Sequence, residues 1–292
     1  MGKLLRGSSK NARFFIVDTK DIVQEALDIH KCSPTAIKAF GRLLTGAVMM
    51  GETLKGNDLL TLRTNTDGLL NQMLVTTDAN GGVKGYLSNS EVDLEIKDGE
   101  VPKVGDLVGK GTLTVIKDMG LKEPYVGISQ MVSGEIGEDI AYYYYTSEQI
   151  PSVVVLGVSL GSDMRVKNAG GYMIQLLPNA SESFIAKLEA KIKVMRPMTE
   201  LLAGGMSLKG IAKLIYDDMD SKDELRLVED YNVYEEKKVS YKCNCSKDKF
   251  YKGLITINKD ELKEIFTEKP ELEVECHFCM KKYSFVEKEL LG

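Results

Sequence analysis

Four of the five cysteines in this chain lie in its last fifty residues, as Cys243-Asn-Cys245 and Cys276-His-Phe-Cys279. Two closely spaced thiol pairs that a fold brings together make a tetrahedral four-sulfur site, and this ligand set suits zinc. The same sulfurs can instead form two disulfides, in which case the metal must leave. The residue types therefore indicate a metal site that could also act as a redox switch.

The spacing of the cysteines leaves two interpretations about equally supported, a permanent structural zinc ribbon and a redox switch. The first pair is Cys-x-Cys, which departs from the Cys-x-x-Cys common in ribbons. In a sulfur-only ligand set, an oxidised thiol also has a partner thiol within reach. His277 could be a ligand only if a cysteine did not bind. Four lysines flank the pairs and are expected to favour the thiolate forms: Lys242, Lys247, Lys281 and Lys282.

Three other patterns resemble sites of catalysis or phosphate binding and are set aside. Gly157-Val-Ser159-Leu-Gly161 matches a nucleophile elbow, but the only histidine after the serine is His277, within the cysteine cluster. The segment 105–111 is a broken phosphate loop, because it is one residue short and no Ser or Thr follows its lysine. Cys32, near His30, is expected to be a packed, inert cysteine. No catalytic residue is predicted, so we do not expect an enzyme.

The composition is that of an ordinary soluble globular protein, with 43% hydrophobic and 28% charged residues among 292. Its net charge of −5 argues against a general nucleic-acid binder, which would carry a basic face. Charges interrupt every apolar run before the roughly 20 residues that a membrane span needs. Clustered cysteines in a large acidic chain fit metal binding in a reducing compartment. We therefore expect a cytoplasmic protein that contacts neither nucleic acid nor membrane.

Residues 1–178 carry most of the strand patterns and predict an α+β core domain. The segment 33–54 begins with Ser33-Pro34, a favourable helix start, and is apolar on nearly all sides. A helix of this kind is a buried one, so a layered β/α/β core is expected, with this helix between sheets. Further helices are predicted at 20–30 and 137–149. Strands are predicted at 12–18, 58–66, 69–77, 83–89, 113–117, 125–132, 152–160 and 172–177.

Residues 179–231 predict a helical linker domain, and residues 232–292 a small zinc-binding domain. In the linker, a helix over 181–195 places Phe184, Leu188 and Ile192 on one face, and shorter helices follow at 198–203 and 207–217. The charged segment 217–238 is interpreted as a solvated boundary. In the last domain, short strands precede each cysteine pair and a capping pattern at 258–261 opens a helix. A module this small would gain about 10 kcal/mol or more of stability from bound zinc.

With these motifs, the sequence resembles the redox-regulated chaperone family of heat shock protein 33. The resemblance is carried by Cys243, Cys245, Cys276 and Cys279, with the long spacer between the pairs. It extends to the segments 148–152 (EQIPS) and 170–178 (GGYMIQLLP), and to Tyr283 and Phe285. It covers essentially the whole chain, in the order core, linker and zinc domain. Cys32 is not part of the family's motif, so no role is assigned to it.

The resemblance implies an ATP-independent holdase, meaning a chaperone that binds unfolding proteins and keeps them from aggregating. In the reduced state, four thiolates would hold one zinc ion and the protein would be inactive and monomeric. Oxidation would form the disulfides Cys243–Cys245 and Cys276–Cys279, release zinc, unfold the linker and favour a homodimer. The apolar face of Phe184, Leu188 and Ile192 would then become available to clients. The alternatives are a zinc-ribbon adaptor that docks constitutively on a protein or RNA and, third, a hydrolase.

Overall fold

A computed structural model of the chain describes residues 1–94, 103–217 and 227–291, and divides them between two compact units. The first unit is Met1–Tyr241 and the second is Lys242–Gly292. Of the charged segment 217–238, residues 218–226 lie outside the described residues. Each unit is described separately below.

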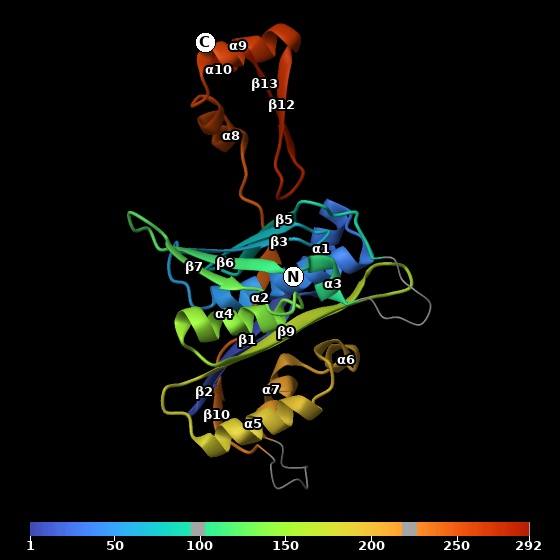
Figure 1. Cartoon of the computed structure of the whole chain (residues 1–292), viewed down its shortest axis with the longest axis vertical. Helices are drawn as coiled ribbons and strands as arrows, with labels where there is room; N and C mark the ends of the chain where they lie inside the picture. Colours follow the sequence, from blue (N-terminus) through green and yellow to red (C-terminus); the bar gives the residue numbers. More distant parts are fainter. Residues whose placement is uncertain (95–102, 218–226, 292) are drawn as a thin grey trace. The chain divides into compact units, whose positions relative to one another are not determined.

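The first unit contains most of the strands and the longest helix (Figure 1). Its strands are β1 (Gly2–Ser9), β2 (Ala12–Asp18), β3 (Leu59–Thr66), β4 (Gln72–Asp78), β5 (Gly82–Leu87), β6 (Gly111–Asp118), β7 (Tyr125–Gln130), β8 (Ser152–Leu160), β9 (Val166–Leu176), β10 (Tyr231–Val233) and β11 (Lys237–Tyr241). Its helices are α1 (Lys20–His30), α2 (Pro34–Gly51), α3 (Val104–Val108), α4 (Gly137–Tyr143), the π-helix η1 (Tyr144–Glu148), α5 (Glu182–Val194), α6 (Met198–Ala203) and α7 (Leu208–Tyr216). Every strand and helix predicted within residues 1–217 is present, with ends shifted by a few residues, and the α+β class is confirmed.

All strands described in the first unit belong to one sheet, in the order β7-β6-β3-β4-β5-β11-β1-β2-β9-β8, with β10 paired to β1. Most neighbours are antiparallel, but β11 runs parallel to β5. The sheet curls, so that its two halves lie on opposite sides of α2 (Figure 1). Helix α4 contacts both end strands, β7 and β8. The predicted layers are therefore two halves of one continuous sheet around a helix.

Helix α2 is the centre of this unit. The Ser33 hydroxyl accepts a hydrogen bond from the Ala36 amide, and Pro34 occupies the first turn, as the sequence predicts. Phe40, Leu43 and Leu44 are fully buried. The helix contacts β3, β4 and β5 on one side and β8 and β9 on the other. The prediction of a helix buried between sheet layers is confirmed.

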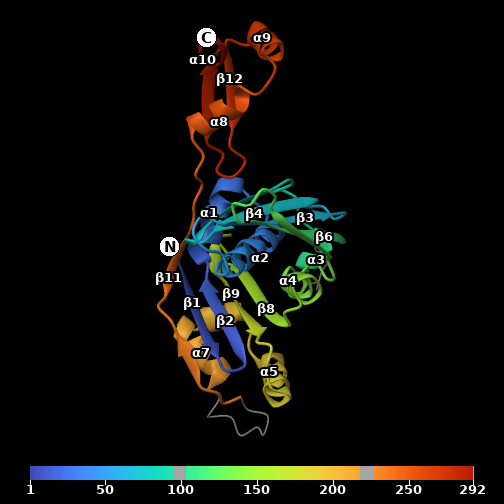
Figure 2. The ribbon, with the colours of Figure 1, turned by 90° about the vertical axis from the view of Figure 1, so that its left-hand side faces the viewer.

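A second apolar cluster lies on the other face of β1, β2 and β9, away from α2 (Figure 2). Phe14, Ile16 and Tyr172 project from these strands. Helices α5, α6 and α7 cover this face and bury it, with Phe184 and Ile211 among the covering side chains. The strands β1, β2 and β9 are thus apolar on both faces.

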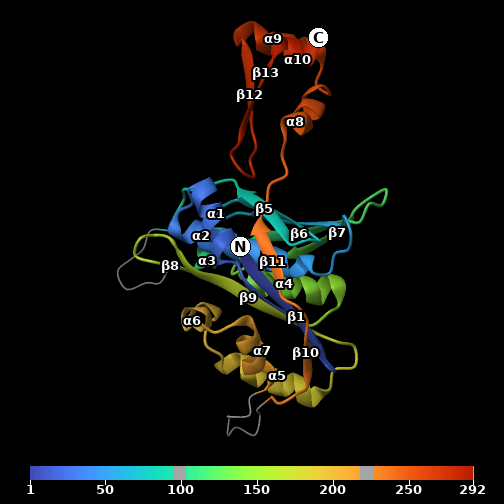
Figure 3. The same cartoon turned by 180° about the vertical axis from the view of Figure 1, so that it is seen from behind.

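Strand β11 joins the two halves of the sheet (Figure 3). Residues 237–239 pair with residues 2–4 of β1, and residues 240–241 pair with residues 82–83 of β5. Residues 232–233 and 237–241, assigned to the zinc domain from the sequence, therefore lie in strands that pair with the first unit. The division of the chain into three domains stays a prediction.

The second unit is small and is built around one hairpin. It contains α8 (Lys247–Leu254), α9 (Lys259–Glu268), the hairpin of β12 (Glu271–Glu275) and β13 (Lys282–Val286), and α10 (Glu287–Leu291). The Asn258 side chain caps α9, at the position that the sequence predicts. Only Leu262, Phe285 and Leu290 form the buried cluster of its described residues. A core of this size stabilises a fold weakly.

Among the described residues, no helix combines the length and the apolar character that crossing a bilayer requires.

Candidate metal centre

The second cysteine pair lies in the turn of the β12–β13 hairpin. The Cys276 amide donates to the Lys281 carbonyl oxygen at 3.0 Å, and the Met280 amide donates to the Cys276 carbonyl at 2.7 Å. These bonds fold the turn so that Cys276 and Cys279 face the same side. In this tight turn, Met280 has a left-handed backbone conformation (φ 55°). For a residue with a Cβ atom, this conformation is unfavourable by about 1–2 kcal/mol.

The first pair lies in an extended stretch that ends at α8. The Ser246 hydroxyl accepts a hydrogen bond from the Lys249 amide and so begins this helix directly after Cys245. The Lys249 ammonium donates to the Asn244 carbonyl at 2.8 Å, between the two cysteines. The helix start thus fixes the backbone that presents Cys243 and Cys245.

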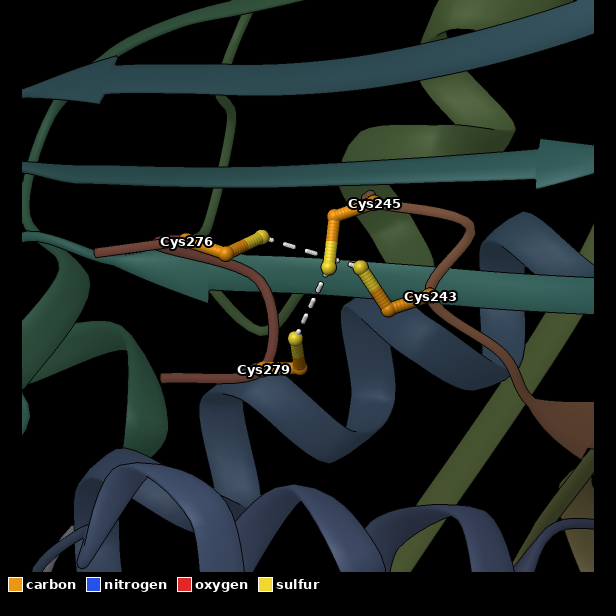
Figure 4. Close-up of side chains that lie close together, drawn as sticks. All are labelled: Cys243, Cys245, Cys276 and Cys279. Atoms are coloured by element: carbon orange, nitrogen blue, oxygen red, sulfur yellow. Dashed lines mark hydrogen bonds between the residues drawn. The ribbon is translucent and has the colours of Figure 1, made fainter. Parts of the chain in front are cut away.

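The four sulfur atoms converge on one point (Figure 4). All of them lie within 4.8 Å of one another, with 3.7 Å between Cys243 and Cys276 and 3.4 Å between Cys245 and Cys279. A tetrahedron with zinc–sulfur bonds of about 2.3 Å has sulfur–sulfur edges of about 3.8 Å. The spacing therefore fits a four-coordinate thiolate site, and these four residues could hold one metal ion.

Tyr283 belongs to this centre although the spacing of the cysteines does not predict it. Its hydroxyl lies 3.2 Å from the Cys245 sulfur. Burial acts to raise the pKa of Cys245, but hydrogen bonds from Tyr283 and the neighbouring thiols outweigh it and lower that pKa to about 7. Burial raises the pKa of Cys243 and, with hydrogen bonding to the other thiols, raises that of Cys279 to about 12. In the metal-free cluster, Cys245 is thus the thiol that ionises most readily of these three.

The flanking lysines have partners of their own in the second unit. Lys247 pairs with the Glu289 carboxylate at 2.7 Å, and Lys282 pairs with Glu273 at 2.7 Å. Lys281 lies over the Tyr283 ring, 5.5 Å from its centroid. The expectation that these lysines favour the thiolate forms stays a prediction.

The two catalytic patterns do not form sites. Ser159 lies within β8 and its hydroxyl contacts Asn168 on the neighbouring strand β9, whereas a nucleophile elbow requires a sharp turn into a helix. The segment 105–111 begins in the short helix α3, where the Gly105 amide donates to the Glu135 carboxylate at 2.9 Å. That amide is therefore occupied by a carboxylate of the same chain.

Cys32 is buried, and burial raises the pKa of its thiol to about 12. The His30 ring lies 3.2 Å from the Tyr241 hydroxyl and packs edge-on against Phe40. The prediction of a packed cysteine is confirmed, and the raised pKa favours the protonated thiol at neutral pH. The lack of reactivity stays a prediction.

The proposed client-binding residues lie on α5 in the first unit. Phe184 and Leu188 are 3% and 2% exposed and belong to the cluster over β1, β2 and β9, and Ile192 is partly buried beside it. These side chains therefore cover an apolar sheet face in this structure. Their role in client binding stays a prediction.

Comparison with known proteins places this arrangement of core and cysteine cluster in a recognised group. A family model described as "Hsp33 protein" matches residues 3–286. A "33 kDa chaperonin" of Clostridium acetobutylicum is 41% identical over 292 residues, covering 99% of this chain and 95% of that protein. A "33 kDa chaperonin" of Clostridium perfringens is 42% identical over 294 residues, covering 99% of this chain and 90% of that protein. The crystal structure of the 33 kDa chaperonin of Thermotoga maritima, a heat shock protein 33 homologue, superposes with a TM-score of 0.85 at 30% identity and covers 98% of this chain and 96% of its own.

Proposed function

This chain belongs to the Hsp33 family, and from that premise we propose that it is a redox-regulated, ATP-independent holdase for unfolding proteins. The family consists of proteins named chaperonins, so the chain is a chaperone and not an enzyme. The proposal concerns the bound metal, the disulfides formed on oxidation, the redox switch and the clients.

The observation that carries the proposal is a four-sulfur cluster in a unit with almost no apolar core. Four thiolates would bind one Zn²⁺, whose binding supplies folding free energy of about 10 kcal/mol or more in small zinc modules. Three buried apolar side chains cannot replace that contribution. Loss of the ion is therefore expected to unfold the second unit.

The switch is the oxidation of the ligands. A thiolate attacks a peroxide oxygen and becomes a sulfenic acid as the peroxide is reduced to water or an alcohol, and a neighbouring thiol then displaces water to form a disulfide. We propose the pairs Cys243–Cys245 and Cys276–Cys279, which lie close in sequence and have sulfurs within 4.8 Å in the reduced cluster. Sulfurs joined in this way no longer bind the ion, and the unit loses its main stabilising interaction.

The surface offered to clients would come from the second apolar cluster. The outer face of β1, β2 and β9 carries Phe14, Ile16 and Tyr172, and α5 to α7 cover it. Helix α5 contributes only Phe184 and Leu188 as fully buried residues, so its attachment is weak. Unfolding of this cover would expose an apolar patch, which unfolded proteins bind.

We further propose that the protein is a monomer when reduced and a dimer when oxidised, and that it acts in the cytoplasm without nucleic acid or membrane. A dimer would bury part of an apolar surface that the switch exposes. A reducing compartment keeps the four thiols free to bind zinc until an oxidant arrives.

The test uses the full chain before and after hydrogen peroxide. We expect native mass spectrometry to show loss of one zinc ion, and denaturing mass spectrometry to show a chain four hydrogens lighter than the reduced, metal-free chain. Trypsin should cleave near 217–238, and aggregation of a chemically unfolded test protein should be suppressed. The variant Cys32→Ser serves as a control and should respond in the same way. Zinc release with a protected linker, or with no suppression of aggregation, would contradict the proposal.

A further inference from the structure

Strand β11 occupies a position in the sheet that could accept another strand. We define the β11 site as the place between residues 2–4 of β1 and residues 82–83 of β5 that residues 237–241 fill. The Ser240 amide donates to the Gly81 carbonyl at 3.0 Å, and Val239 lies opposite Gly2. Without β11, backbone donors and acceptors of β1 and β5 would be unpaired, and such edges bind extended chains.

The β11 site also has places for particular side chains. Val239 and Tyr241 point inward and are 1% and 7% exposed, as members of the main apolar core. The Tyr241 hydroxyl donates to the Gly85 carbonyl at 2.8 Å and lies 3.2 Å from the His30 ring. Removal of the strand would leave two apolar pockets, those of Val239 and Tyr241, which lie two positions apart along the strand. The Tyr241 pocket would end at the Gly85 carbonyl and the His30 ring.

A buried carboxylate adds a charge requirement. The Glu52 side chain is 3% exposed, and its partner at 2.6 Å is the Lys237 ammonium of β11. Lys237 also donates to the Ala79 carbonyl at 2.7 Å. If β11 leaves, the ion pair that Glu52 keeps within the described part of the chain is the one with the Arg6 guanidinium, at 4.0 Å. A buried carboxylate without a close partner is costly, so the vacated position favours a new basic residue.

We propose that the β11 site binds an extended segment of an unfolded client with the pattern basic-x-apolar-x-aromatic, as it binds Lys237, Val239 and Tyr241 in this structure. Residues 237–241 would then be an internal occupant that blocks the site in the reduced protein. Only Lys242 separates Tyr241 from the ligand Cys243, so unfolding of the second unit would begin next to the end of this strand. The inference rests on the proposed function, because a second strand can enter only after β11 has left.

The occupant explains why a chaperone would favour such segments. Clients expose short apolar stretches flanked by charges. Backbone pairing gives affinity for extended chains, and the places for the alternate side chains give the preference for this pattern. While β11 is attached, it competes from the same chain at an effective concentration in the millimolar range, which a dilute client cannot match. Release of the strand removes that competitor.

The test is a labelled peptide with the sequence of residues 235–242, acetyl-Glu-Glu-Lys-Lys-Val-Ser-Tyr-Lys-amide, added to the full chain. A control peptide of the same composition exchanges Lys238 with Val239 and Ser240 with Tyr241, which turns both apolar side chains to the opposite face. By fluorescence anisotropy, we expect saturable binding to the peroxide-treated chain and none to the reduced chain. The exchanged peptide should bind about tenfold more weakly or worse, and a Lys237→Glu peptide about tenfold more weakly.

The same oxidised sample is assayed for suppression of client aggregation, with and without the peptide. Suppression that the native-register peptide reverses supports the inference. If the oxidised chain suppresses aggregation but binds both peptides equally, or binds neither, the inference is overturned and the proposed holdase function stands. If the oxidised chain binds the native peptide selectively but does not suppress aggregation, the holdase function is overturned and the strand-binding site stands. A peptide that converts dimer to monomer without affecting suppression would assign the site to a second copy of the chain, which also overturns the client assignment.

Discussion

The two compact units of this chain differ in what keeps them folded. The first unit surrounds a mostly apolar helix, α2, with the two halves of a large sheet, and its core includes Phe40, Leu43 and Leu44 at no exposure. The second unit has three buried apolar side chains and four converging sulfurs. Apolar burial does not respond to oxidants, whereas thiolate ligation ends when the sulfurs are oxidised. A signal can therefore unfold the second unit and leave the core around α2 folded.

The largest expected effect tests the second unit. Cys276→Ser removes a ligand, so the unit should lose its metal and most of a stabilisation of about 10 kcal/mol. Calorimetry should show the transition of the second unit disappear while that of the core around α2 stays, and metal analysis should show no bound zinc. Cys32→Ser is the matched control and should retain both. A Cys276→Ser protein whose second unit melts normally would break the comparison.

The next effect tests the first unit. Phe40→Ala opens a cavity beside α2 and should lower the free energy of unfolding of this unit by about 3–5 kcal/mol. Denaturant unfolding measures this loss, and the metal content should stay unchanged. Leu121→Ala, at a 66% exposed side chain, should change stability by less than about 0.5 kcal/mol. Loss of metal in Phe40→Ala would mean that the two units are not independently stabilised.

A smaller effect tests how β11, the last strand of the first unit, is held in the sheet. Tyr241→Phe removes the hydroxyl that donates to Gly85 and leaves a buried carbonyl without this partner, at a cost of about 1–2 kcal/mol. Hydrogen exchange should become faster at the Ser240 amide in the reduced protein. Tyr234→Phe, at a half-exposed tyrosine that contacts Ser8, is the control and should leave this amide unaffected. Unchanged exchange in Tyr241→Phe would show that β11 is held by its other contacts.

The smallest effect uses two methionines with the same backbone conformation. Met280 (φ 55°) directly follows Cys279 in the hairpin turn, Met164 (φ 60°) lies in the first unit, and both side chains are exposed. Glycine relieves left-handed strain at either position, so each substitution should stabilise its own unit by about 1 kcal/mol. Met280→Gly should bind zinc more tightly in a chelator competition, and Met164→Gly should not. Equal effects of both on zinc binding would contradict the separation of the units.

The elements that could be predicted from the sequence are those whose side chains show one simple pattern. Helix α2 is apolar on nearly all sides because the sheet surrounds it, and β2 is a short apolar run. Strand β1 was missed because Leu4 belongs to the main core and Leu5 to the second cluster, so its side chains do not alternate between apolar and polar. The five-residue helix α3 is too short to show a period. Its glycines suggested a loop.

At the metal centre, the residues could be predicted but not their surroundings. The spacing of the cysteines identifies the four converging sulfurs, because each pair is local in sequence. The Tyr283 contact with Cys245 depends on how β13 lies beside the first pair, and no sequence pattern encodes it. The ion pairs of Lys247 and Lys282 are likewise non-local, because Glu289 and Glu273 approach them from other elements. The pairing of β11 with β1 and β5 is also non-local.

The pairing of β1 with β11 has a consequence for how the protein is made. Strand β1 leaves the ribosome long before residues 237–241, so it lacks this neighbour until they emerge. Until then the nascent chain carries an incomplete sheet. Cys279 follows β11 along the chain, so the four sulfurs can converge only after the last strand of the sheet has been synthesised. The sheet of the first unit can thus be completed before the cysteine cluster forms.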